Sequence, residues 1–172
     1  MSDYRFTPTG VIRLSDGAQI PNAPGNRDWL DYLAWNEAGG ITNPQYTLED
    51  AKAQRLVLIE AACANAITEG FTSSALGAAY LYPSKASDQS NLQASVLASL
   101  FPGLAEDWTT PFWCQAADGS WAYRPHTAAQ IQRAGTDGKD AINACIARKI
   151  LLEQQVHEAT THPEVEAVIW TT

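Results

Sequence analysis

The stretch 112–159 limits the fold most, because it joins a short hairpin pattern directly to a long helical pattern. Two apolar runs flank Asp118-Gly119, a pair that favours the type I′ two-residue turn of a β-hairpin. Such a turn would place Cys114 opposite Tyr123. We therefore expect two antiparallel strands whose register this turn fixes.

The pleat of those strands sorts the hairpin side chains onto two faces. The residues expected on the core face are Phe112, Cys114 and Ala116, with Trp121 opposite Ala116. The residues expected on the other face are Trp113, Gln115, Ala122 and Arg124. On that face Trp113 and Arg124 would form a cation–π contact or belong to a binding surface. The alternative is that they only stabilise the hairpin on its solvent-facing side.

The helical pattern that follows has a clear start and two weak points. Thr127 and Gln130 are spaced as a capping box, and apolar residues recur at helical spacing as far as Ala159. Gly135 and Gly138 lower helix propensity, so the helix can bend or break there. An unbroken helix would be about 50 Å long and would project beyond a small domain. A projecting part needs a partner, and self-association through the long helix would supply one.

The N-terminal part repeats the hairpin signal on a smaller scale. Residues 10–21 turn on a second Asp-Gly pair, and Asn26 is a good N-cap for a short helix that stops at a Gly-Gly pair. This helix carries Trp29 and Trp35, together with further aromatic and apolar residues. A helix this aromatic must pack on the next region or on another chain, so both tryptophans are candidate interaction residues.

The expected architecture is an α+β fold, in which short Asp-Gly hairpins pack with several helices, including the long C-terminal one. The Asn-Pro step within 41–45 predicts a linker between a hairpin-helix unit, 1–45, and a larger α+β unit, 46–172. The remaining predicted elements are a helix over 47–69, a hairpin over 71–82, a helix from a Ser87-Asp88 cap to about 101, and a closing strand over 165–170.

Composition argues against several classes of partner. The chain has 172 residues, 45% of them hydrophobic and 17% charged, as expected for a folded globular protein. Its formal net charge is −8, with only 11 Lys and Arg, so nucleic acid and anionic membrane surfaces are not expected partners. Cys63, Cys114 and Cys145 are odd in number and widely spaced, which predicts reduced core cysteines in a cytoplasmic product. We also see no signal peptide and no apolar run of membrane-spanning length. Six Trp and six Tyr are typical either of an aromatic core or of a protein–protein interface.

Little in the sequence predicts catalysis. Cys114 and His126 would form a nucleophilic dyad if the fold brought them together, but Cys114 is expected on the core face. The three histidines, His126, His157 and His162, have no metal-binding spacing, and no phosphate-binding glycine loop is present. We therefore expect no enzyme activity, no cofactor and no metal.

Several blocks of the sequence resemble phage proteins. The stretch VIRLSDGAQIPNAPGNRDWLDYLAWNEAGG is similar to the opening of many phage and prophage proteins encoded beside tail fibres. The pieces ITEGFTSSALG, YPSKASDQSNL and WTTPFWCQAADGSWAYRPHTAAQIQ resemble a phage-associated domain of unknown function. The blocks occur in the same order and together cover nearly the whole chain.

The resemblance implies a non-enzymatic accessory or assembly protein that binds a phage tail fibre. Proteins of this class help fibres trimerise in the cytoplasm of the bacterial host and can stay bound in the virion tail. Two alternatives remain open: a permanent structural subunit of the tail or baseplate, and a Cys-dependent hydrolase that uses Cys114. The resemblance supplies no catalytic residues.

Overall fold

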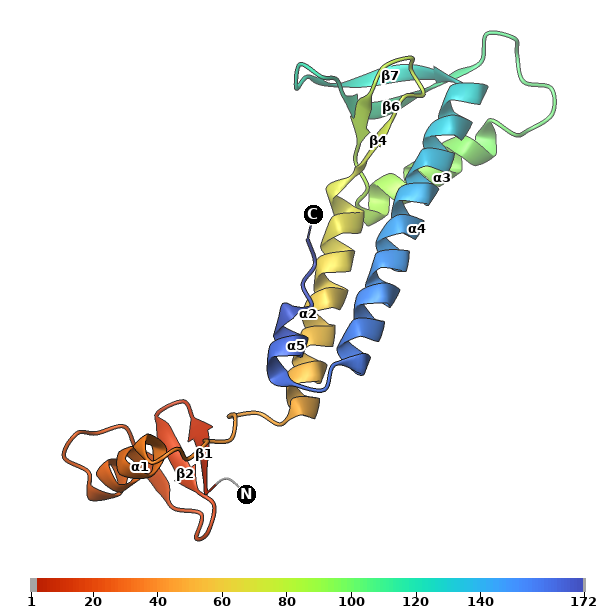
Figure 1. The fold of residues 1–172 in the computed structure, drawn as a ribbon. Helices are drawn as coiled ribbons and strands as arrows, with labels where there is room; N and C mark the ends of the chain where they lie inside the picture. Colours follow the sequence, from red (N-terminus) through yellow and green to blue (C-terminus); the bar gives the residue numbers. More distant parts are fainter. Residues whose placement is uncertain (1–2, 172) are drawn as a thin grey trace. The chain divides into compact units, whose positions relative to one another are not determined.

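The computed structural model describes residues 3–171 and divides the chain into two units, Met1–Ala53 and Gln54–Thr172 (Figure 1). Five helices and two antiparallel sheets lie within the described residues, so the predicted α+β class is confirmed. The division between the units falls inside the second helix, α2, and each unit has a hydrophobic cluster of its own.

The N-terminal unit is a small sheet with one helix against it. Its strands β1 (Tyr4–Thr7), β2 (Gly10–Arg13) and β3 (Gln19–Pro21) are antiparallel in the order β1-β2-β3. Helix α1 (Arg27–Glu37) begins at the predicted cap, where the Asn26 side chain accepts a hydrogen bond from a first-turn amide. The end of the unit is held on the sheet by the backbone of Asn43. Its amide donates to the Tyr4 carbonyl oxygen, and its carbonyl oxygen accepts from the Phe6 amide of β1. Asn43, inside the predicted linker, is therefore held by the sheet.

The C-terminal unit contains a four-stranded sheet and four helices (Figure 1). In chain order its elements are α2 (Leu48–Glu69), β4 (Phe71–Ser73), β5 (Tyr80–Tyr82), α3 (Ala86–Ala98), β6 (Thr109–Gln115), β7 (Trp121–Thr127), α4 (Ala128–Glu158) and α5 (His162–Ala167). The sheet order is β4-β5-β6-β7, and each neighbouring pair is antiparallel. The predicted helices and the predicted 71–82 hairpin are present, although α3 begins before the expected Ser87-Asp88 cap.

The predicted register of the β6–β7 hairpin is wrong by one residue. Trp113 pairs with Tyr123 and Cys114 pairs with Ala122, so Tyr123 does not lie opposite Cys114. A type I′ turn needs positive φ at both central residues, but among the described residues only glycines have positive φ, and here that residue is Gly119. The Gly119 amide bonds back to Ala116, which makes a longer turn with a left-handed glycine and shifts the pairing.

This shift also corrects the predicted faces. Residues directly opposite each other share a face of the sheet, so Ala122 and Arg124 lie on the side of Cys114 and Phe112. The other side carries three aromatic side chains, Trp113, Trp121 and Tyr123. The shared face predicted for Trp113 and Arg124 is therefore wrong.

Helix α4 is one continuous helix of 31 residues through both glycines. Its start is the predicted capping box, in which Thr127 and Gln130 bond to each other's backbone amides. The glycines are sites of close approach, because a Cβ at Gly138 would lie 2.8 Å from the Phe71 ring and one at Gly135 would lie 2.7 Å from the Val96 side chain. Tertiary packing therefore offsets their low helix propensity.

Helix α2 supplies the packing partner that the length of α4 required. The two helices lie side by side and antiparallel in Figure 1, and we call this pair the stem. Ile59 of α2 packs with Leu152 and Val156 of α4, and Lys149 forms an ion pair with Glu60. The stem buries one stripe of α4 within the same chain.

The predicted closing strand over 165–170 is wrong. Residues 165–167 are instead the end of α5, whose Thr161 cap and Glu164 form a capping box, and Val165 and Val168 are buried. The motif Thr-x-x-Glu, with Pro163 in the first turn, is a helix-start signal that outweighs the alternating apolar pattern after it.

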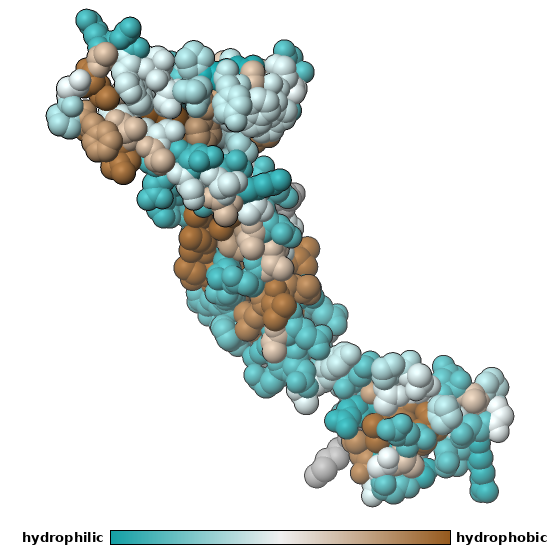
Figure 2. Space-filling model, turned by 180° about the vertical axis from the view of Figure 1, so that it is seen from behind, coloured by the Kyte–Doolittle hydropathy of each residue, from teal (hydrophilic) through white to brown (hydrophobic). Residues whose placement is uncertain are grey.

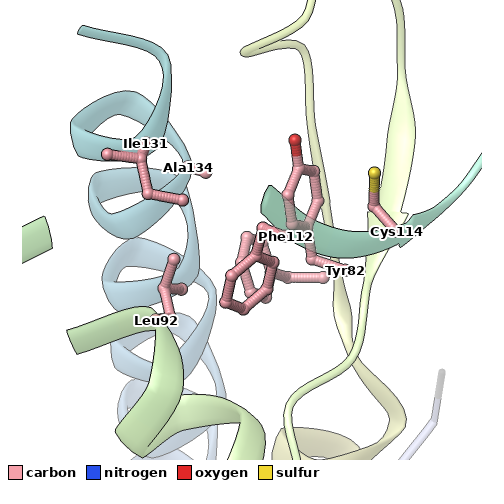
Figure 3. Packing of buried hydrophobic residues seen from close by; sticks show 7 residues of the cluster. Tyr82, Leu92, Phe112, Cys114, Ile131 and Ala134 are labelled. Atoms are coloured by element: carbon pink, nitrogen blue, oxygen red, sulfur yellow. The ribbon is translucent and has the colours of Figure 1, made fainter. Parts of the chain in front are cut away.

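Figure 3 shows the core of the C-terminal unit, where the sheet meets α3 and α4. Tyr82 and Phe112 point from the sheet toward Leu92 of α3 and toward Ile131 and Ala134 of α4. All of these side chains are buried, as are Phe71 and Cys114 of the same cluster. This core holds the β6–β7 hairpin against the N-terminal half of α4 and so positions the surfaces of both.

Candidate functional site

The two residues of the conceivable nucleophilic dyad are both buried in the core. His126 is fully buried, and both of its ring nitrogens have partners other than a thiol. One nitrogen lies 2.7 Å from the Tyr82 hydroxyl and the other lies 2.8 Å from the Arg124 carbonyl oxygen. The carbonyl can only accept, so Nδ1 carries the proton, and Nε2 accepts from Tyr82. This arrangement is that of a neutral structural histidine.

The thiol of Cys114 is not an activated nucleophile. Burial raises the pKa of its thiol, although Arg124 acts in the other direction. A thiolate nucleophile needs a lowered pKa and access to substrate. The three cysteines are all free thiols, and Cys63 is buried in the stem, where its pKa is also raised by burial.

The neutral state of His126 makes stability depend on pH. Burial lowers the pKa of His126 below its ordinary value of about 6.5. As the pH falls below about 6.5, the unfolded chain binds a proton that the folded chain resists, so the free energy of unfolding decreases. We expect urea denaturation to show this loss between about pH 6.5 and 5, with a slope of at most about 1.4 kcal/mol per pH unit.

Substitutions separate this effect from other titrations. The carboxyl groups whose pKa values are lowered, such as Asp50 and Glu164, lose their contribution only at more acidic pH. H126Q should remove the loss between pH 6.5 and 5, whereas H157Q, at an exposed position, should retain it. A wild-type stability that stays constant from pH 7 to 5 would show that His126 is not held neutral.

A large concave surface, with a volume of about 880 Å³, lies between α3 and α4. We call it the α3–α4 groove. Its apolar lining comes from Leu92, Val96, Leu97 and Leu100 on the α3 side, and from Ile142 and the two glycines on α4. Leu97 and Leu100 are both more than half exposed. The groove thus presents leucine side chains that no part of the described chain covers fully.

An apolar strip on α4 continues from this groove along the stem. Ile146 and Ile150 follow Ile142 at intervals of four residues, so the three lie on one helix face. Ile150 is 57% exposed. Figure 2 shows brown apolar surface interrupting the polar surface along the stem. The groove and the strip therefore form a run of exposed apolar side chains, whereas exposed apolar residues on an ordinary surface are scattered singly.

A second surface is the outer face of the β6–β7 hairpin, which we call the aromatic face. It consists of Trp113, Trp121 and Tyr123, whose exposed fractions are 39%, 38% and 70%. A cleft of about 390 Å³ lies beside it, lined on one side by Trp113 and Tyr123 and on the other by α3. Trp113 was predicted on this outer face. Trp121 and Tyr123 were predicted on the core face, because the turn is longer than the expected type I′ turn.

The other predicted interaction residues have structural contacts. Trp29 and Trp35 are partly buried against the aromatic cluster around Tyr32 in the N-terminal unit. Arg124 donates a hydrogen bond to the Cys114 carbonyl oxygen, and its guanidinium lies 5.1 Å from the centre of the Tyr80 ring. Within the C-terminal unit, Arg124 therefore lies on the opposite face of the hairpin from Trp113.

The described residues contain no other constellation that indicates chemistry. Within residues 3–171, no group of three His, Cys, Asp or Glu side chains is arranged to hold a metal ion. Over the same range, no helix combines the length and apolar character needed to cross a membrane.

Comparison with known proteins identifies one family. The family model described as a domain of unknown function, DUF4376, matches residues 50–169, which is more than half of the chain. The chain belongs to the DUF4376 family. The DUF4376 match runs from the first turns of α2 past the end of α5, and so it includes the α3–α4 groove and the aromatic face. No curated protein and no solved structure matches the chain.

Proposed function

We propose that this chain is a non-enzymatic accessory protein that binds a phage tail fibre during assembly in the cytoplasm of the bacterial host. The observation that carries a protein-binding function is the α3–α4 groove with its continuation along the stem. Apolar grooves between helices take amphipathic segments of protein partners. The resemblance of several ordered sequence blocks to proteins encoded beside tail fibres supports a fibre as the partner.

The same observations rank the alternatives. A Cys-dependent hydrolase is disfavoured, because Cys114 is buried and His126 is bonded to Tyr82. A permanent tail or baseplate subunit would use the same groove, so it differs from an assembly factor only in staying with the particle. Self-association would use the strip of Ile146 and Ile150, the part of α4 that α2 leaves exposed.

Co-expression with the tail-fibre protein encoded beside this chain tests the proposal. We expect a complex of defined stoichiometry in size exclusion with light scattering, and a higher yield of soluble trimeric fibre. A chain that remains alone and leaves fibre yield unchanged would refute it. Mass spectrometry of purified particles then separates the assembly factor, which is absent, from the permanent subunit, which is present in stoichiometric amounts.

A pair of matched leucines tests the groove. L97E places a charge in the groove and should weaken fibre binding at least tenfold, which corresponds to about 1.4 kcal/mol. L58E is the control, because Leu58 is equally exposed at 57% but lies on α2 beside the C-terminal segment. Thermal melting should show that both variants stay folded. Equal binding by L97E and wild type would remove the groove from the interface.

A further inference from the structure

We propose that the aromatic face and the cleft beside it bind an uncharged oligosaccharide. The hairpin exposes three aromatic rings on the side that its core does not use. Trp113 and Trp121 are nearly parallel, with ring centroids 6.0 Å apart, and Tyr123 follows 4.9 Å from Trp113. Trp113 thus contacts both other rings, and the three form one contiguous exposed aromatic cluster on the hairpin.

Such an exposed aromatic cluster suits the rings of a sugar. Trp and Tyr have an apolar body and a polar edge, so they stay at the surface and bind amphipathic ligands. A pyranose ring presents C–H groups on its faces and hydroxyl groups around its rim. Its faces pack on aromatic rings while the hydroxyl groups reach polar side chains or water. One sugar ring of an oligosaccharide would pack on the aromatic face while its neighbours reach the cleft beside it.

The cleft supplies the polar side chains that a sugar needs. Its α3 wall carries Asp88, Asn91 and Ser95, opposite Trp113 and Tyr123. Asp88 also accepts a hydrogen bond from the Lys85 backbone amide, which fixes its carboxylate at the start of α3. A carboxylate accepts, while an amide and a hydroxyl both donate and accept. This mixture matches hydroxyl groups, which do both.

Charge selects among ligands that stack on aromatic rings. The cleft has no Lys or Arg among its described lining residues, and the chain has a net charge of −8. Both features disfavour phosphorylated, sulfated and uronic acid polymers. A proline-rich peptide also binds aromatic grooves, but its carbonyl groups can only accept and would face the Asp88 carboxylate. An uncharged saccharide fits these groups better.

This inference goes beyond the proposed fibre binding and uses a different surface. The cleft is lined by Asp88, Asn91 and Ser95, whereas the groove is lined by Leu92, Val96 and neighbouring residues on the other side of α3. Substitutions on the aromatic face should therefore leave fibre binding intact. Loss of one activity does not imply loss of the other.

Titration of the full chain with cellohexaose, chitohexaose and maltoheptaose, followed by tryptophan fluorescence and calorimetry, tests the site. We expect saturable binding of at least one of them, with a Kd between about 10 μM and 5 mM. W113A and W121A should each weaken it at least tenfold, and N91A at least threefold. W29F is the matched control, because it removes a tryptophan of the N-terminal unit and should leave the Kd unchanged.

Three results would overturn the site. The first is no binding of any of these oligosaccharides at about 10 mM. The second is binding that the W113A/W121A double variant leaves unchanged while the protein stays folded by thermal melting. The third is binding only to polygalacturonate or to a proline decamer, which would assign the aromatic face to a charged polymer or to a peptide.

Discussion

Replacing Tyr82 with alanine should lower the free energy of unfolding of the C-terminal unit by about 3–5 kcal/mol. Tyr82 is fully buried, and its ring stacks on Phe71 and Phe112 in the centre of the core. Truncation removes this packing and leaves a cavity that the surrounding sheet and helices fill only partly. It also removes the hydroxyl that donates to His126. Urea denaturation followed by circular dichroism at pH 7.5 measures the loss.

Tyr82→Phe separates the hydrogen bond from the packing. The ring stays, but the buried Nε2 of His126 loses its donor, and an unsatisfied buried acceptor costs about 1–3 kcal/mol. Tyr123→Ala is the control, because Tyr123 is 70% exposed and surface substitutions change stability by about 0.5 kcal/mol or less. If Y82F were as stable as wild type, Nε2 of His126 would not depend on the Tyr82 hydroxyl as its hydrogen-bond donor.

The elements that local chemistry specifies could be predicted from the sequence. Asn26 and the Thr127/Gln130 pair are capping signals, each of which involves only residues a few positions apart, and both helices begin where these signals place them. The β6–β7 register could not be predicted in the same way. Asp118-Gly119 fits both a type I′ turn and a longer turn with only Gly119 left-handed, and only the second puts the buried His126 on the same face as Phe112 and Cys114.

The candidate surfaces were harder to predict than the elements, because a surface depends on which helices meet. Trp113 was found from strand alternation, but Trp121 and Tyr123 changed faces with the one-residue shift. The groove needs α3 and α4 to pack with Val96 against Gly135, a contact between residues 39 positions apart in the sequence. No periodicity within either helix shows that contact.

Adding a side chain at Gly138 should have the second large effect on stability. A Cβ there would lie 2.8 Å from the Phe71 ring, closer than side chains pack. We expect G138A to lower the free energy of unfolding by about 1–3 kcal/mol and G138V by more, because overpacking forces α4 away from β4. The sign is informative, since helix propensity alone predicts that Gly→Ala within a helix stabilises by about 1 kcal/mol.

Asn143→Ala provides the comparison for this prediction, because Asn143 is an exposed residue of the same helix. This change should stabilise slightly, as propensity predicts. The double variant G138A/F71L relieves the clash at the ring, so the cost of G138A should shrink in that background if contact with Phe71 is its cause. An equal cost in both backgrounds would place the cause elsewhere.

The contact between Gly138 and Phe71 also sets how α4 approaches β4 at the inner end of the α3–α4 groove. The proposed fibre binding should therefore weaken together with stability in G138V.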